Sequence, residues 1–147
     1  MTGGKGDMYK HILVPVDGSE TAFKAAREAL ALAKLFGSKV VALYVVELRR
    51  LKEYEEDERE QVKRKLREFG VKTLERVQAE AGKFDVTFES MVKEGAPAEV
   101  IVETAREIEA ELIVIGTRGL TGLKRMVLGS TAYRVVEWAD CHVLVVK

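Results

Sequence analysis

The sequence predicts one α/β domain, a doubly wound parallel sheet of five strands with helices on both faces. Short apolar runs of the kind that form buried strands alternate with segments of helical periodicity. The chain has 147 residues, which suits one domain with its own core, and no linker or internal repeat divides it. Hydrophobic residues make up 47% and charged residues 33%, as in globular proteins with a charged surface.

The first strand is predicted over residues 10–16, "KHILVPV", a β-branched apolar run that ends in the turn "DGS". A helix follows, with Ser19 placed to cap its start and Gly37 to end it. Its buried face is predicted from apolar residues at helical spacing: Ala22, Phe23, Ala26, Ala29, Leu30 and Ala33.

The second strand is predicted over residues 39–46, "KVVALYVV", a continuous apolar run typical of a central strand. The charged segment at residues 47–83 follows, and Gly70 is expected to weaken its helix. The helical stripe consists of Val62, Leu66, Phe69, Thr73, Val77 and Ala81. Favourable charge pairs four residues apart are Glu55–Arg59, Glu60–Arg64 and Glu68–Lys72.

The early part of this segment, "EYEEDERE", is strongly acidic. One interpretation is a site for a partner. We favour the solvated face of a helix, because runs of charge usually serve that purpose.

The third strand is predicted over residues 84–92, "FDVTFESMV", where apolar and polar residues alternate as in a half-exposed edge strand. Phe84, Val86 and Phe88 then share one face. "KEGAP" turns the chain, and Pro97 suits the first position of the next helix. The buried stripe of that helix consists of Val100, Ile101, Ala105 and Ile108.

The last elements are a buried strand at residues 111–116, a helix at residues 130–138 and a final strand at residues 141–147. Cys141 begins the apolar run "CHVLVV" and is interpreted as a buried small residue rather than a reactive thiol. As the only cysteine it can form no intrachain disulfide, which fits a reducing compartment.

The overall charge argues against some classes of function. Lys plus Arg and Asp plus Glu both number 24, so a general basic surface that binds polyanions, and with it nucleic-acid binding, is not expected.

No apolar run approaches the roughly 20 residues of a membrane span. The opening "MTGGKGDMYK" lacks a hydrophobic signal segment and predicts a flexible lead over residues 1–8. We therefore expect a cytoplasmic protein.

Two loops follow strands at the edge where ligands bind in open parallel sheets. They are "PVDGS" after the first strand and "GTRGLTG" after the fourth. If the first and fourth strands are neighbours at the point where strand order reverses, both loops face one crevice.

The second loop has the composition of an anion site. Gly116 ends a strand, Gly119 and Gly122 permit a tight path, and Gly129 opens a helix with Ser130 and Thr131. Residues 112–136 contain no Asp or Glu, yet they include Arg118, Lys124, Arg125 and Arg134. Phosphate is the expected occupant. The alternative is an ordinary strand-to-helix loop with Ser130 as the helix cap.

Other familiar site patterns do not match. The chain contains neither G-x-x-x-x-G-K-[ST] nor a G-x-G-x-x-G after the first strand, so the NTPase P-loop and the dinucleotide fingerprint are disfavoured. His11 and His142 lie far apart and no cysteines cluster, so no metal site is expected.

"G-T-R-G", nine residues and "G-S-T" together resemble the G-x2-G-x9-G-[ST] signature of the nucleotide-binding universal stress proteins. The resemblance covers residues 9–147. Its other marks are "ILVPVDGSETA", "ALYVVE", "VKEGAPAEVIVETA" and "HVLVVK". It departs at His142, where the family usually has proline, and at Glu111, where aspartate is more usual. The resemblance implies the strand order 3-2-1-4-5 and an adenine-nucleotide alpha-hydrolase-like fold.

The resemblance also implies the roles of the site residues. Pro15 and Val16 would line the base pocket, Asp17 would lie near the ribose or adenine, and Val45 would present backbone atoms to the adenine edge. An alternative for Asp17 is a local bond to backbone N–H groups. The loop would wrap the ribose and first phosphates through Gly116, Thr117, Arg118, Gly119, Thr121 and Gly122. Gly129, Ser130 and Thr131 would hold the phosphates.

The function implied is a regulatory switch in the stress response that binds ATP, or ADP or AMP, with Mg²⁺ or Mn²⁺ held mainly by the phosphates. A homodimer through the last strand is expected, along with an unknown protein partner. No general base stands out, so at most slow ATP hydrolysis is expected. The alternatives are a nucleotide-free dimeric scaffold of the same fold, or a true ATPase or adenylate-type transferase.

Overall fold

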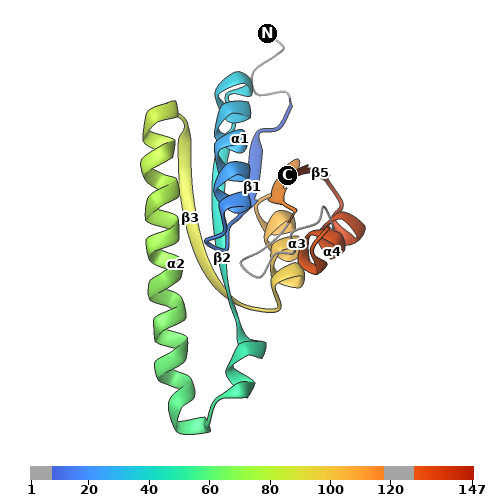
Figure 1. Ribbon diagram of the computed structural model, residues 1–147. Coiled ribbons are helices and arrows are strands. Elements are labelled where there is room, and N and C mark those ends of the chain that lie inside the picture. Colours follow the sequence, from blue (N-terminus) through green and yellow to red (C-terminus); the bar gives the residue numbers. More distant parts are fainter. Residues whose placement is uncertain (1–7, 118–127) are drawn as a thin grey trace.

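The computed structural model describes residues 8–117 and 128–147 (Figure 1). Residues 1–7 of the predicted N-terminal lead lie outside this part. The described elements are β1 (His11–Pro15), α1 (Glu20–Phe36), β2 (Lys39–Glu47), the 3₁₀ helix η1 (Leu48–Glu53), α2 (Glu56–Phe84), β3 (Thr87–Gly95), α3 (Pro97–Glu107), β4 (Leu112–Gly116), α4 (Ser130–Trp138) and β5 (His142–Val146).

The strands form one parallel sheet in the order β3-β2-β1-β4-β5, which confirms the predicted fold class and strand order. β1 lies in the middle, with Ile12 beside Val40 of β2 on one side and beside Leu112 of β4 on the other. The chain builds outward from β1 to β3 and then crosses to β4. The strand order therefore reverses between β1 and β4.

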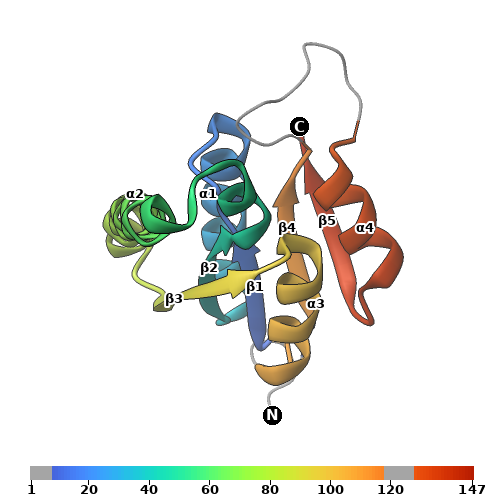
Figure 2. The ribbon, with the colours of Figure 1, turned by 90° about the horizontal axis from the view of Figure 1, so that it is seen from below.

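Helices cover both faces of the sheet, α1 and α2 on one side and α3 and α4 on the other (Figure 2). Side chains of β1 alternate between the two cores. Ile12 and Val14 pack with α1 and α2, whereas Leu13 packs with α3 and α4, and all three are fully buried. The central strands are unbroken apolar runs in the sequence because helices cover both faces of the sheet.

The ends of α1 follow the predicted capping chemistry. The side chain of Ser19 accepts a hydrogen bond from the N–H of Ala22 over 3.2 Å. At the other end Gly37 has a left-handed φ of 71°, and its N–H bonds to the carbonyl of Ala33 over 2.8 Å. Both predictions are confirmed, because both depend on residues close in sequence.

Gly70 does not interrupt α2, and its predicted effect on helix stability stays a prediction. The helix runs without a break from Glu56 to Phe84, and Gly70 is buried within it. A Cβ at this position would lie 2.3 Å from Cδ2 of Tyr44. The glycine is required because the tyrosine ring of β2 packs directly against the helix backbone.

The predicted charge pairs within α2 do not form among the residues that the structure describes. Instead, Lys63 lies 3.1 Å from Glu94 of β3, and Arg67 also bonds that carboxylate. Two other cations of α2 thus connect the helix to β3. The acidic residues 53–60 are all exposed, as expected for a solvated surface, although residues 53–55 precede the helix.

The third strand begins later than predicted. Phe84 is the last residue of α2, and Asp85 ends the helix with a left-handed φ of 56° and an N–H bond to the carbonyl of Ala81. β3 therefore occupies Thr87–Gly95. It lies at the edge of the sheet, as predicted, and Phe84, Val86 and Phe88 pack against one core cluster.

Candidate functional site

The candidate residues lie where the strands end on one edge of the sheet. Because all strands are parallel, the segments after Pro15, Val45 and Gly116 lie at the same edge as the start of α4. The structure therefore brings together the described members of the predicted site. Arg118, Gly119, Thr121 and Gly122, with Lys124 and Arg125, lie outside the described residues.

The segment after β1 is held in a turn by Asp17. One oxygen of its carboxylate, Oδ1, accepts the backbone N–H of Ser19 over 2.9 Å. The preceding residue, Val16, donates its N–H to the carbonyl of Leu43 over 2.8 Å, so the turn begins directly at the sheet. The local role considered for Asp17 is confirmed, and contact with a nucleotide stays a prediction.

The end of β2 extends past the end of β1. Lys39 donates its N–H to Lys10 and Leu43 accepts the N–H of Val16, so alternate residues of β2 direct their backbone groups toward β1. By this alternation Val45 does the same, but β1 has already ended at Pro15. The backbone groups of Val45 on this side therefore have no partner strand in β1, and its half-buried side chain packs on the α3 side of the sheet.

Gly116 packs against the first turn of α1. A Cβ at Gly116 would lie 2.9 Å from Oγ1 of Thr21 and 3.0 Å from its carbonyl oxygen. The missing side chain thus permits close packing of α1, a reason other than the ligand approach expected from the sequence. This contact joins the turn after β1 to the end of β4.

Two backbone hydrogen bonds hold the start of α4 at the end of β4. Gly129 donates its N–H to the carbonyl of Thr117 over 2.7 Å, and Thr117 donates its own to Val146 over 2.8 Å. The predicted Gly129 segment is thus placed beside Gly116 and Thr117, although ten intervening residues, 118–127, are not described.

The start of α4 offers unpaired donors. Gly129, not Ser130, occupies the cap position, and no side chain caps the helix. Within the described residues, neither the exposed Ser130 hydroxyl nor the Thr131 hydroxyl has a hydrogen-bond partner, and the first backbone bond is from Tyr133 to Gly129. The alternative of Ser130 as an ordinary cap is therefore wrong. Free N–H groups and a helix dipole together favour an anion.

Charged residues surround Tyr44 near the end of β2. Burial raises the pKa of Tyr44, Arg50 lowers it, and Asp17 and Glu47 raise it further. Tyr44 therefore lies within electrostatic reach of Asp17 and of Arg50, which belongs to η1. We did not single out Arg50 from the sequence, although the cations of "LRRLKE" directly after the second strand were a usable signal.

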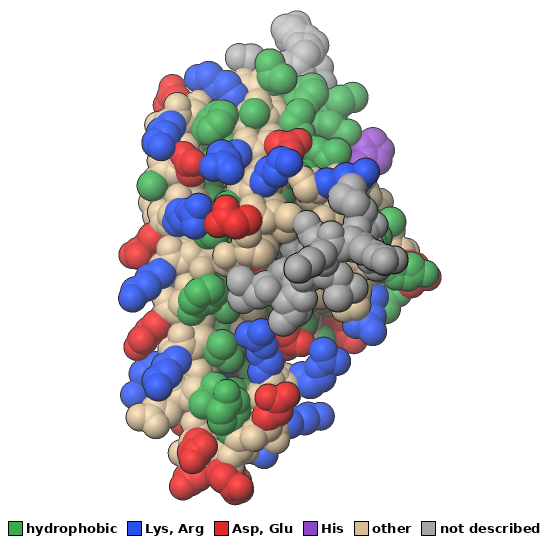
Figure 3. Space-filling view, viewed as in Figure 1, with side chains coloured by type: hydrophobic (Ala, Val, Ile, Leu, Met, Phe, Trp, Pro, Cys, Tyr) green, Lys and Arg blue, Asp and Glu red, His purple; other side chains and the backbone are tan. Residues whose placement is uncertain are grey.

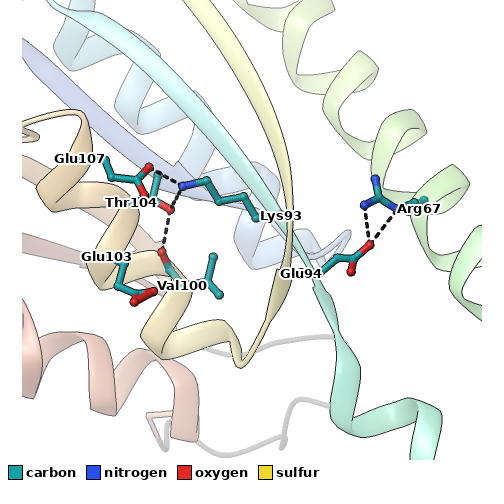
Figure 4. Close-up of a pocket in the computed structure, with 7 residues that line it drawn as sticks. All are labelled: Arg67, Lys93, Glu94, Val100, Glu103, Thr104 and Glu107. Atoms are coloured by element: carbon teal, nitrogen blue, oxygen red, sulfur yellow. Dashed lines mark hydrogen bonds and ion pairs between the residues drawn. The ribbon is translucent and has the colours of Figure 1, made fainter.

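A separate groove lies between α2, β3 and α3 (Figure 4). Its volume is about 480 Å³, and it is lined by Arg67, Lys93, Glu94, Val100, Glu103, Thr104 and Glu107. Lys93 points to α3 and donates to Thr104 over 2.9 Å and to Glu107 over 2.6 Å, whereas Glu94 points to Arg67 of α2. Both cations are thus paired with carboxylates.

The charges on one face of the molecule form no patch of a single sign. Basic and acidic side chains are interspersed over the face that carries α2 (Figure 3). Among the described residues no cluster of three or more His, Cys, Asp or Glu suits a metal ion. No helix in this part of the chain is long and apolar enough to cross a membrane. Cys141 is half-buried against the α3 and α4 core, and burial raises its pKa.

Comparisons with known proteins concern the family and the fold. The sequence model of the Universal stress protein family matches residues 8–147. A universal stress protein of Methanocaldococcus jannaschii is 42% identical over 142 residues, which cover 96% of this chain and 84% of that relative.

Two solved structures share the fold. The universal stress protein UspA from Lactobacillus plantarum is 27% identical, with a TM-score of 0.87 over 97% of this chain and all of that one (100%). The universal stress protein from Archaeoglobus fulgidus in complex with dAMP is 24% identical, with a TM-score of 0.68 over 95% of this chain and 99% of that one.

Proposed function

The chain belongs to the universal stress protein family, and from this premise we propose that it binds an adenine nucleotide, foremost ATP, at the carboxyl edge of its sheet. The start of α4 is the observation that carries the proposal. Its N–H groups and the Ser130 and Thr131 hydroxyls lack partners among the described residues, and they follow Gly129, whose N–H bonds Thr117 at the end of β4. The dAMP complex of the A. fulgidus protein makes adenine nucleotides the first class to test.

The nucleotide would lie across the crevice from β2 to α4. Its base would contact Pro15, Val16 and the backbone of Val45, which faces past the end of β1. Asp17 would accept a ribose hydroxyl with the carboxylate oxygen that does not bond Ser19.

The other end of the nucleotide would lie at the start of α4. Gly129, Ser130 and Thr131 would hold the phosphates. The loop would complete the ribose and phosphate contacts through Gly116, Thr117, Arg118, Gly119, Thr121 and Gly122. We assign Mg²⁺ or Mn²⁺ to the phosphates, which carry the hard oxygen ligands that these ions prefer.

We propose a regulatory switch with at most slow ATP hydrolysis rather than an efficient enzyme. Fast hydrolysis needs a group that positions and activates water beside the terminal phosphate. In the described part of the chain no carboxylate or histidine bonds the hydroxyls of Ser130 or Thr131. Binding would order the segment between Thr117 and Gly129 and so alter a surface read by a protein partner.

The switch would act as a cytoplasmic homodimer joined through β5. β5 ends the sheet, and an open edge usually pairs or is covered. Leu144 on this strand is 36% exposed, and Tyr133, Val136 and Trp138 of the neighbouring α4 are also exposed. These apolar groups would be buried between the two copies.

Calorimetric titration with Mg-ATP tests the proposal. Wild-type protein should bind near one equivalent, and the double variant Ser130→Ala, Thr131→Ala should bind about tenfold more weakly because two donors are lost. The matched control is Ser90→Ala, at an exposed position on β3. Equal affinities for the wild type and the double variant would remove the start of α4 from the site. Phosphate release that depends on Asp17 and Ser130 at an efficient rate would favour the ATPase alternative.

A further inference from the structure

Two consecutive residues of α2, Phe69 and Gly70, contact the two segments proposed to hold the base. Phe69 contacts the turn that follows β1, and Gly70 contacts β2 one residue before Val45. α2 lies on the opposite face of the sheet from the Val45 side chain. These contacts therefore support the proposed base position from the α2 face of the sheet.

The first contact fixes the turn at Asp17. Gly18 has a left-handed φ of 92°, and a Cβ built on it would lie 2.5 Å from Cζ of Phe69. The phenyl ring thus lies directly on the backbone of Gly18. A bond from the hydroxyl of Thr73 to the carbonyl of Phe69, over 2.9 Å, links this turn of α2 internally.

The second contact fixes the end of β2. The ring of Tyr44 fills the space left by Gly70, where a Cβ would lie 2.3 Å from Cδ2 and 2.7 Å from Cε2. The rings of Tyr44 and Phe69 meet edge to face with centroids 6.1 Å apart. The two contacts form one continuous unit from the turn after β1 to the end of β2.

The exposure of Phe69 shows that burial in the core alone does not explain an aromatic residue at this position. Its side chain is 42% exposed, whereas Val77, two turns further along the same stripe, is 1% exposed. An aromatic ring that stays half in water contributes less to the core than a buried one. Its ring lies over Gly18, in the turn that carries Asp17.

We propose that Phe69 and Gly70 are positioning residues for the base and ribose half of the nucleotide site. They set the spacing between the Asp17 carboxylate and the Val45 backbone, while neither touches the nucleotide. This inference rests on the proposed function.

Binding of ATP and of adenosine to Phe69→Ala tests the inference. The variant should bind both ligands about tenfold more weakly than wild type, since only the shared base and ribose half is disturbed. Ser130→Ala should weaken ATP alone. The variant that combines Phe69→Ala with Ser130→Ala should show the sum of the two effects on the free energy of ATP binding, because the base end and the phosphate end of the site are independent. Phe69→Met, which keeps a side chain over Gly18, should retain most of the affinity.

Two controls separate positioning from loss of stability. Val71→Ala removes an exposed apolar side chain from the neighbouring helix position, 47% exposed, and should leave both affinities unchanged. Val77→Ala removes a buried one and should lower the unfolding temperature at least as much as Phe69→Ala, with adenosine affinity retained.

The outcomes distinguish this inference from the proposed function. Wild-type affinity for adenosine in Phe69→Ala overturns the positioning role, and so does equal weakening by Val77→Ala; in both cases nucleotide binding itself stands. Failure of the wild-type protein to bind any adenine nucleotide overturns the proposed function and the positioning role together.

Discussion

Gly116 lies so close to Thr21 that a Cβ on the glycine would be 2.9 Å from the threonine Oγ1. Gly116 ends β4, and Thr21 lies in the first turn of α1. The contact therefore joins the two sides of the point where strand order reverses. It keeps the turn after β1 beside the segment that leads to α4.

Gly116→Ala should destabilise the protein. The added methyl group meets backbone atoms of α1 that cannot rotate away, so we expect a loss of about 1–3 kcal/mol in the free energy of unfolding, with weaker nucleotide binding. Urea denaturation measures the first effect. Gly82→Ala is the matched control: it meets nothing within 4 Å in α2 and should stabilise by about 0.5–1 kcal/mol. Unchanged stability in Gly116→Ala would contradict the packing assigned to β4 and α1.

Substitutions of Asp17 separate its two roles. Asp17→Asn keeps an oxygen that can accept the N–H of Ser19, so its stability should match wild type, whereas Asp17→Ala should lose about 1 kcal/mol. Both should bind adenosine more weakly, because a carboxylate is the stronger acceptor for a ribose hydroxyl. Thermal unfolding and calorimetry measure the two effects. Wild-type affinity for adenosine in Asp17→Asn would contradict the ribose contact and leave Asp17 only its role in stabilising the turn.

The ion-pair cluster at Glu94 should make stability depend on acid pH. Hydrogen bonds from Arg67 and Lys63 hold the pKa of Glu94 below its ordinary value of 4.5. A lowered folded-state pKa contributes stability above the unfolded value, and the contribution is lost as pH falls through the folded value. Glu94→Gln should therefore be less stable than wild type by about 0.5 kcal/mol at pH 7.

This difference should shrink below pH 4.5. Denaturation at pH 7, 5 and 3 measures the trend, written as the free-energy difference between wild type and Glu94→Gln. High salt at pH 7 should reduce it as well, because the pairs are partly exposed. A difference that grows toward low pH would contradict the assigned ion pairs.

A charge on β5 should disrupt the proposed dimer. Leu144→Lys places an ammonium group on the exposed side of the edge strand, where burial against a second copy would cost its hydration. Analytical ultracentrifugation should show a dimer for wild type and a monomer for the variant. Leu35→Lys, on the exposed side of α1, is the control and should stay dimeric. Dimeric Leu144→Lys would place the interface elsewhere.

Sequence patterns predicted the features that depend on neighbours in the chain. Ser19, Gly37 and Pro97 mark helix ends through local chemistry, and all three occupy the predicted positions. The parallel arrangement of the strands followed because helical segments separate them along the chain, whereas the strand order was implied by the family resemblance.

Features that depend on distant contacts were missed. Gly70 looked like a helix weakness because its partner, Tyr44, comes from another element. Lys63 and Arg67 bind Glu94 of β3, which no spacing within α2 reveals. At the site, the turn role of Asp17 was one of two open interpretations. The packing of Gly116 on Thr21 had no sequence signal, since a glycine at a strand end has several uses.

The measurement that tests the central claim most directly is the identity of any nucleotide carried by the purified protein. The protein is denatured and removed, and the released small molecules are identified by chromatography and mass, with a molar ratio to the chain. We expect an adenine nucleotide near one equivalent, or its stoichiometric uptake when Mg-ATP is added to protein that carries none. No released nucleotide together with no calorimetric binding of Mg-ATP would contradict it, and the start of α4 would then be only the junction between a strand and a helix.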